Sequence, residues 1–353
     1  MSRIPLLFVL ILLALAPLAG FAEEAEPEED KKAFNLPEMM FHHVLETHDW
    51  HLVDIPKGGG QYLPVIISLP WIVYSGDNGL DVFMLSGHTD AELNAAAAER
   101  GYTYGHGKLH TASGASVIDI SISKTVLQMM LIAALMLYIF IAVAKGYKKN
   151  EGHAPKGVQS FFEPVILFVI DDICKPNLRG RHQAFAPYML TLFFFIAFSN
   201  LLGLTPLNSN IMGNISITAA LATLTFILIN ANTTATYWQH IFWFPGVPVP
   251  VKFIMLPVEL VGMFARPFAL LIRLFANITA GHFMMLALIG LIFLLGKSGE
   301  SVGGAVGILP MSLAFGLFIM TLEVLVALVQ AYVFKLLTSV FIGMAMESHD
   351  DHY

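Results

Sequence analysis

The stretch PVELVGMFARPFALLIRLFANITAGHFMMLALIGLIFLL (residues 257–295) is almost entirely apolar, and so is LPMSLAFGLFIMTLEVLVALVQAYVFKLLTSVFIGMAM (residues 309–346). As helices they extend roughly 58 Å and roughly 57 Å, nearly twice the thickness of the hydrocarbon core of a bilayer. Each helix must therefore tilt strongly or bend, with Pro267 as a candidate for the bend. We expect a long tilted helical hairpin, with the chain turned by the Gly-rich residues 299–307.

The composition of the whole chain agrees with a membrane protein. Its 353 residues are 56% hydrophobic and only 13% charged, and the mean hydropathy is +0.69. A soluble domain is roughly 25% charged, so the composition argues against an ordinary cytosolic enzyme. A net charge of −7 argues against a nucleic-acid partner. The single cysteine, Cys174, excludes an intramolecular disulfide and a thiolate metal cluster.

Three further apolar stretches precede the hairpin, so we predict an all-α polytopic membrane protein with about five membrane segments. The three are residues 125–144, 184–206 and 213–237. Residues 157–174 are also apolar but contain three carboxylates and a proline, which favours a helix on the membrane surface. Four lysines between residues 145 and 156 place the end of the first span in the cytoplasm by the positive-inside rule. The carboxyl terminus is then cytoplasmic and the amino terminus is not.

The first third of the chain differs from the rest. Residues 1–22 have the pattern of a cleaved secretory signal peptide, with an uncleaved anchor helix as the alternative. Residues 23–120 then form a soluble extracytoplasmic segment, and residues 121–353 form the membrane domain. Within the soluble segment we expect some β structure in two runs around the turn Gly76-Asp77-Asn78-Gly79, followed by a linker or short helix; the runs are residues 62–76 and 80–85, and the linker is residues 89–116.

A histidine-rich patch lies near the start of the soluble segment. It contains His42, His43, His48 and His51. Imidazoles this close together on a helix are competent transition-metal ligands. No companion carboxylate or cysteine spacing matches a known metal site, so we expect a plain amphipathic surface helix, and no metal or cofactor.

Ionisable groups inside the two long helices need a partner, a water path or a function, because each costs about 3 kcal/mol or more in the bilayer. At 100° per residue, four polar residues of the first helix fall within about 40° of one line. They are Glu259, Arg266, Arg273 and Asn277. His282 points about 180° away from Arg273. Glu323 and Gln330 are seven residues apart and share one face of the last helix.

Arg273 is too deep to reach the inner surface, and an arginine cannot deprotonate in a protein. It can hold a carboxylate ionised or repel cations, whereas His282 and Glu323 can relay protons. Three structural explanations stay open. Helix tilt carries Lys335 and Arg266 to an interface, His282 is a hydrogen-bonded packing residue, or Arg273 and Glu323 form a purely structural ion pair.

The segments 257–282 and 322–345 resemble subunit a of the rotary F-type ATP synthases. The resemblance is closest in RLFANITAGH (residues 273–282) and in the spacing of Glu323 and Gln330, and it covers roughly residues 123–347. It implies a proton-translocating stator subunit of the bacterial inner membrane, packed against the c-ring, with subunit b and the rest of the complex as further partners. Such a subunit performs no bond chemistry itself.

The resemblance also implies roles by position. Arg273 matches the family's essential arginine, which faces the ring carboxylate and separates two aqueous half-channels. Four residues match the lining of the outer half-channel, and Glu259 lies where polar groups near the inner one occur. The four are Asn277, His282, Glu323 and Gln330. In some members of the family an acidic residue stands at the position of His282 and a histidine at the position of Glu323. In this sequence the two residue types are therefore exchanged.

Two other classes of function compete with this interpretation. A stand-alone secondary transporter or cation channel would use Arg273 to bind an anion, and it predicts inverted repeats that we do not find. An intramembrane hydrolase requires a nucleophile and base or a metal pair, and no such motif is present in the spans. The resemblance does not explain residues 23–120, which we expect to serve docking or stability on the outer face.

Overall fold

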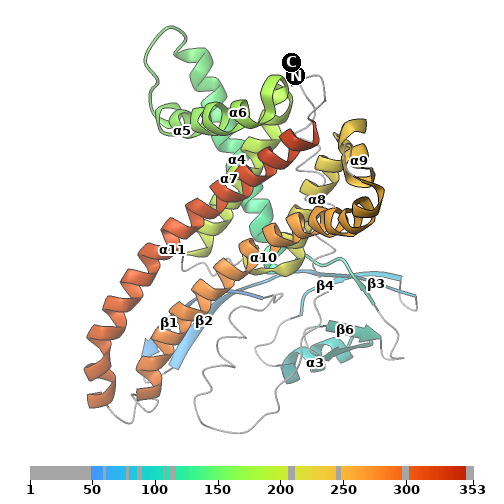
Figure 1. Ribbon diagram of the computed structural model, residues 1–353. Coiled ribbons are helices and arrows are strands. Elements are labelled where there is room, and N and C mark those ends of the chain that lie inside the picture. Colours follow the sequence, from blue (N-terminus) through green and yellow to red (C-terminus); the bar gives the residue numbers. More distant parts are fainter. Residues whose placement is uncertain are drawn as a thin grey trace.

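A computed structural model shows a membrane helical bundle preceded by a smaller part with strands (Figure 1). The structure describes residues 49–58, 61–76, 79–85, 90–105, 108–111, 117–205, 211–243, 248–295 and 302–346. The expected signal peptide and three of the four patch histidines, His42, His43 and His48, lie outside the described residues.

The described residues of the amino-terminal part form three small antiparallel sheets and one helix. A hairpin pairs β1 with β2, a three-stranded sheet has the order β4-β3-β7, and a second hairpin pairs β5 with β6. The bounds are β1 Asp49–Gly58, β2 Gln61–Ser68, β3 Trp71–Ser75, β4 Gly79–Phe83, α3 Asp90–Ala98, β5 Tyr102–Gly105, β6 Lys108–Thr111 and β7 Ile118–Asp119.

This part confirms the expected turn around residues 76–79, but the run at residues 62–76 is divided between β2, which pairs with β1, and β3, which pairs with β4. It also corrects two other predictions. His51 lies in β1, so the end of the histidine patch is strand and not helix. The expected linker at residues 89–116 contains α3 and the β5–β6 hairpin. For the strands the errors have one cause, because β1, β5 and β6 find their partners only in the folded chain.

Among the described residues, four helices are long and apolar enough to cross a bilayer: α4 Lys124–Lys149, α7 His182–Gly203, α10 Val249–Leu295 and α11 Val302–Ala345. The fifth expected segment, α8 Ile215–Ala231, is apolar but has 17 residues. It ends six residues before the predicted boundary, because Asn232 and Thr233 bond back to carbonyls of the helix and Thr234 caps a separate helix, α9 Ala235–Phe242.

The segment between α4 and α7 does not form a span, as predicted. It consists of α5 Val158–Leu167, the π-helix η2 Phe168–Cys174, α6 Lys175–Leu178 and the short 3₁₀ turn η3 Arg179–Arg181. A second 3₁₀ turn, η4 Ile211–Gly213, precedes α8. Figure 1 shows α5 and α6 across the end of the bundle where α4 finishes.

Helices α10 and α11 form the expected long antiparallel hairpin, and both begin earlier than predicted. Helix α10 starts at Val249, where Pro250 in the first turn loses no intrahelical hydrogen bond, and it continues through Pro257, the predicted start. Helix α11 starts at Val302 and includes three glycines of the expected turn. The rest of that turn, residues 296–301, lies outside the described residues. Figure 1 shows α10 bent, and Pro257 and Pro267 lie inside it.

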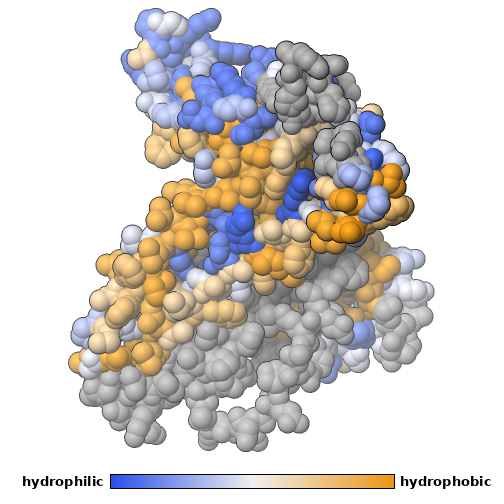
Figure 2. Space-filling view, viewed as in Figure 1, coloured by the Kyte–Doolittle hydropathy of each residue, from blue (hydrophilic) through white to orange (hydrophobic). Residues whose placement is uncertain are grey.

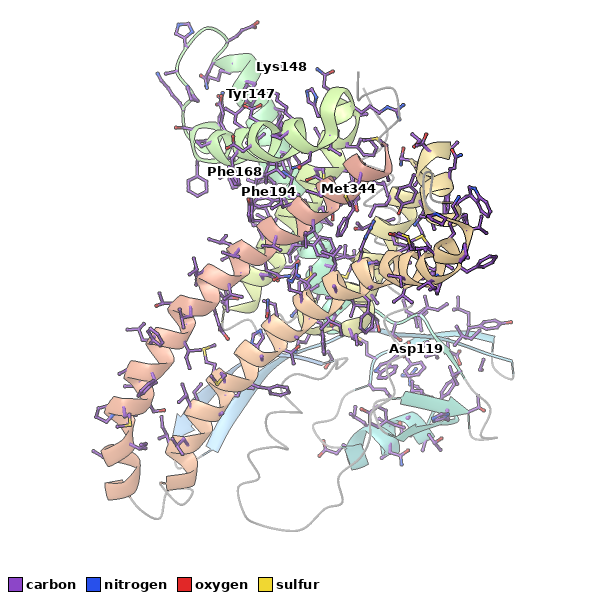
Figure 3. All side chains as sticks on the ribbon, in the orientation of Figure 1. Asp119, Tyr147, Lys148, Phe168, Phe194 and Met344 are labelled. Carbon is purple, nitrogen blue, oxygen red and sulfur yellow. The ribbon has the colours of Figure 1, made fainter. Side chains whose placement is uncertain are left out.

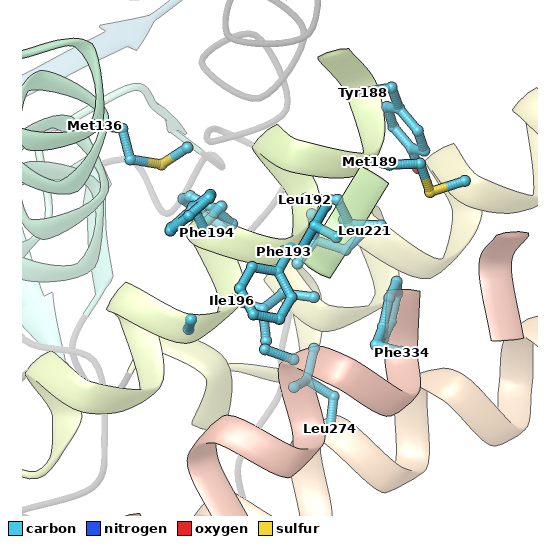
Figure 4. Close-up of a cluster of buried hydrophobic side chains, with 14 of the residues drawn as sticks. Met136, Tyr188, Met189, Leu192, Phe193, Phe194, Ile196, Leu221, Leu274 and Phe334 are labelled. Atoms are coloured by element: carbon cyan, nitrogen blue, oxygen red, sulfur yellow. The ribbon is translucent and has the colours of Figure 1, made fainter. Parts of the chain in front are cut away.

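Helix α7 is the centre of the bundle. Leu192, Phe193 and Ile196 from α7 lie in one buried cluster with Leu274 of α10 and Phe334 of α11 (Figure 4). In the most apolar stretch of α7, 56% of residues are buried, against 11% in α10 and in α11. The hairpin therefore uses one narrow face to join the bundle and has a broad apolar surface that the described residues do not cover (Figure 2).

Candidate functional site

Arg273 lies near the middle of α10, about 36 Å along the helix from its start and about 33 Å from its end. It is half-buried, at the border between two faces of the helix. Leu274 is fully buried against the bundle, whereas Ile272 is 40% exposed. Within the described part of the chain, the guanidinium has no hydrogen-bond or ion-pair partner. A permanent charge is thus held at mid-helix beside the uncovered apolar surface.

One turn from Arg273, a hydrogen bond connects the two long helices. The side-chain amide nitrogen of Asn277 donates to Oε1 of Gln330 at 3.0 Å. Gln330 is buried, and its own Nε2 has no partner among the described residues. Figure 2 shows hydrophilic residues gathered between the two helices near the middle of the hairpin. The sequence placed both residues on polar faces, and the structure brings those faces together.

Two turns from Arg273, the Glu323 carboxyl group lies against the α10 backbone at Gly281. A β-carbon at Gly281 would lie 2.9 Å from Cδ of Glu323 and 3.1 Å from its Cγ, and closer still to Oε1. Both carboxyl oxygens are buried and have no hydrogen-bond partner in the described residues. His282 follows directly in α10 and is half-buried. Gly281 is therefore required for the close approach of Glu323.

The explanation that Arg273 and Glu323 form a structural ion pair is wrong for this hairpin. Glu323 lies level with Gly281, which is about 12 Å along α10 from Arg273. As predicted, Glu323 and Gln330 share a face of α11, because both contact α10. Arg273 thus keeps a charge that no acid of the described chain neutralises.

We call one set of side chains the polar row: Glu259, Arg266, Arg273, Asn277 and His282 of α10 with Glu323 and Gln330 of α11. Its other half extends toward the start of α10. Arg266 lies over the ring of Phe341, with its guanidinium carbon 5.3 Å from the ring centre. It also lines a small pocket with Asn230 of α8. Glu259 lies two further turns away and is half-buried. The packing of Arg266 on Phe341 holds its charge within the protein.

Lys335 does not reach an interface by helix tilt, which corrects that explanation. It is fully buried, and its ammonium group donates a hydrogen bond to the carbonyl oxygen of Val169 in η2. Burial raises the pKa of the neighbouring Cys174 thiol, although the Lys335 ammonium acts in the opposite direction. Gly343 likewise lets the backbone of Asn177 come close. These contacts attach the surface segment to the end of α11.

Sequence reasoning missed several polar atoms near this row. The amide of Asn200 in α7 donates to the carbonyl of Ala327 in α11 at 3.2 Å. Its side-chain oxygen and the hydroxyls of Ser199 and Thr279 are buried without a partner among the described residues. The signal was available, because Ser199 and Asn200 interrupt an otherwise apolar run in α7.

The close approach at Gly281 gives a first testable prediction. Gly281→Ala must displace the Glu323 carboxyl group, so we expect ion-driven ATP synthesis to fall severalfold in the reconstituted complex. Gly262→Ala is the matched control on the same helix, since nothing lies within 4 Å of a β-carbon there. Equal activity of the two variants would contradict a role for the Glu323 position.

Comparison with known proteins decides the family. A family model described as the ATP synthase A chain matches residues 126–343. ATP synthase subunit a of Anaeromyxobacter sp. (strain Fw109-5) is 40% identical over 352 residues, which covers 96% of this chain and 77% of the relative. This chain belongs to the ATP synthase A chain family. The subunit a of Chloroherpeton thalassium is 42% identical over 241 residues, 66% of this chain and 69% of the relative.

Membership makes this subunit a multi-pass membrane component of the F-type ATP synthase, acting in ion transport and ATP synthesis within a complex of several subunits. Residues 39–127 match a second family model, described as a domain of unknown function (DUF8433). The additional amino-terminal part thus has a family of its own. Among the described residues, no group of three or more His, Cys, Asp or Glu side chains is placed to hold a metal ion.

Proposed function

We propose that this subunit carries protons between the two sides of the membrane through two half-channels that meet at Arg273 against the c-ring. The observation that carries the proposal is the unpaired guanidinium of Arg273 at mid-helix, beside the uncovered apolar surface of the hairpin. A buried charge is stable when a partner neutralises it, and none of the described residues does so. A carboxylate on the ring is the partner that this position favours.

The outer half-channel runs from the α10–α11 turn toward Arg273. Its proposed lining is Glu323 and His282, followed by Asn277 and Gln330. The unpartnered polar atoms of Asn200, Ser199 and Thr279 support a hydrated path, because buried polar groups nearly always have hydrogen-bond partners, often water. The inner half-channel lies toward Glu259, on the other side of Arg273.

The mechanism requires no bond chemistry, and we infer that the subunit is not itself an enzyme. A proton passes Glu323 and His282 and neutralises a ring carboxylate, which then rotates away through the lipid. When a protonated carboxyl returns on the inner side, the positive charge of Arg273 favours its ionised form and the proton leaves. Each proton releases about 2.3 kcal/mol per 100 mV, and Arg273 prevents a direct leak.

The proposed topology follows from the ends of α4. Figure 3 shows Lys148 and Tyr147 near one end of α4, with Met344 of α11 toward the same side, and Asp119, which precedes the start of α4, away from them. The lysines at the end of α4 favour a cytoplasmic position for that end. The carboxyl terminus is then cytoplasmic, and residues 23–120 follow a signal peptide at residues 1–22 on the outer face of a bacterial inner membrane. Subunit b is a further proposed partner.

A stand-alone transporter or channel is the alternative, and the fold does not favour it. Such proteins bind substrate at helices broken near the midplane, in two related halves. In the described residues α10 runs through the level of Arg273 without a break. The hairpin also has no counterpart in the first half of the membrane body, where α4 and α7 are single spans.

Cross-linking tests the ring-facing surface. A photoreactive maleimide on Ile272→Cys or Leu325→Cys should attach to the ring subunit in the assembled complex, because both side chains lie on the uncovered face of the hairpin. Leu137→Cys on α4 is the control, since it is 51% exposed on another helix. Adducts are identified by mass. Ring adducts from Leu137→Cys alone would overturn the proposed orientation.

A further inference from the structure

The sheet β4-β3-β7 has an apolar face that nothing in the described chain covers. Tyr74 lies opposite Leu80 and Ile118, and Ile72 lies opposite Val82, so these side chains share one face. Leu80, Val82 and Ile118 are 64%, 62% and 60% exposed. An antiparallel sheet at the surface of a soluble domain usually presents polar side chains to water. This sheet does the opposite.

The other face of the same sheet is already the core of the amino-terminal part. Trp71, Val73 and Phe83 are buried there against Ala97 of α3 and Tyr102 of β5. Asp81 is also on this covered side, where it accepts a hydrogen bond from the Tyr102 hydroxyl. The carboxylate is thus directed into the domain, and the uncovered face is left entirely apolar.

The sheet is fastened directly to a membrane-spanning helix. The amide of Ile120 donates to the carbonyl of Ile72 at 2.8 Å, and the hydroxyl of Ser121 accepts from the amide of Ile72 at 2.9 Å. Ser123 already caps α4. Ile122 is the only residue between the last bond to the sheet and the cap. The sheet is therefore held at the membrane surface where α4 begins.

The uncovered face is directed toward the membrane body. Figure 1 shows α3 and β6 on one side of β3 and β4, and the membrane helices on the other. Since α3 and the β5–β6 hairpin cover the Val73 face, the Tyr74 face is the one nearer the bilayer. Continuity with α4 and this orientation identify one occupant for the face, the lipid itself.

We propose that the Tyr74–Leu80–Val82–Ile118 face of the sheet is a monotopic membrane anchor, immersed in the headgroup and upper acyl region of the leaflet in which α4 begins. The tyrosine suits this depth, because its ring is apolar and its hydroxyl reaches water. Interfacial elements immerse an apolar face by about 5–10 Å while their polar side stays in water. The anchor fixes the amino-terminal part against the bilayer.

Spin-label depth measurement tests the anchor in the assembled complex in phosphatidylcholine vesicles. Val82→Cys carries the nitroxide, with Leu80→Cys as a second position in case the first disturbs folding. Glu99→Cys is the control, since Glu99 is exposed just after α3, which covers the opposite face of the sheet. Cys174 is fully buried and should take up no label. Collisions with lipid-soluble oxygen should exceed those with a water-soluble nickel chelate at Val82 severalfold, and the order should reverse at Glu99.

Two other outcomes of this measurement would overturn the proposed membrane anchor. A Val82 label as open to nickel as the Glu99 label would place the face in water. A label that neither oxygen nor nickel reaches would show a protein cover, from another subunit or from the residues before Asp49. The measurement reads depth and not ATP synthesis, so its result is independent of the mechanism at Arg273.

Discussion

Arg273→Ala should abolish ion-driven ATP synthesis while the complex still assembles and stays as stable as the wild type. The guanidinium has no partner in the described chain, and an unpaired charge costs about 3 kcal/mol in the bilayer. Its removal therefore breaks no contact within the described part of this subunit, so the fold of the subunit should keep its stability. The measurement compares ATP synthesis, passive proton permeability and thermal unfolding of the reconstituted complex. Passive permeability should not fall, because the charge that separates the two half-channels is gone.

Arg266→Ala is the matched control, seven residues away on the same helix. Arg266 packs on Phe341 and lines a pocket with α8, so its loss should lower stability more than Arg273→Ala does. It should leave ion-driven synthesis largely in place. Normal ATP synthesis with Arg273→Ala would refute the half-channel mechanism. A loss of stability in Arg273→Ala but not in Arg266→Ala would show that Arg273 has a structural role.

The hairpin could be predicted from the sequence because its signals are local. Helix length follows from the apolar runs, and the seven-residue spacing of Glu323 and Gln330 places both on the face that contacts α10. The boundaries are less accurate, since the apolar run predicts a start at Pro257 although a long helix packed on its neighbours can include this proline. Short strands such as β7 have no clear sequence signal without their partner β3.

The contacts of the ionisable residues could not be predicted, because they depend on segments far apart in the chain. Lys335 is buried by η2, and its partner Val169 is 166 residues away. Asn200 meets α11 across 127 residues. Periodicity gives the direction in which a side chain points along its own helix, but it cannot say which helix lies opposite. The ring-facing and bundle-facing sides of α10 are distinguished by tertiary burial alone.

Glu323→Gln should reduce ion-driven ATP synthesis by about a hundredfold, the low end of what a positioned proton-transfer group contributes. The substitution keeps the shape that fits against Gly281 but removes the ability to take up and release a proton. Thr321→Val is the control on α11, because Thr321 is exposed and its hydroxyl bonds only within its own helix in the described chain. Synthesis and proton uptake by the reconstituted complex measure both effects.

An exchange of the two titratable residues separates proton relay from packing. His282→Glu and Glu323→His, each alone, leave two like groups at the outer end of the row and should both be impaired. The double variant restores one acid and one imidazole in exchanged places, and we expect it to recover a substantial part of the synthesis lost in the single variants. Gly281 leaves space for the new side chain at position 323, since it offers no β-carbon of its own. A double variant no better than the worse single variant would show that Glu323 acts through its fit against Gly281, and the proton path would then have to be sought elsewhere along the hairpin.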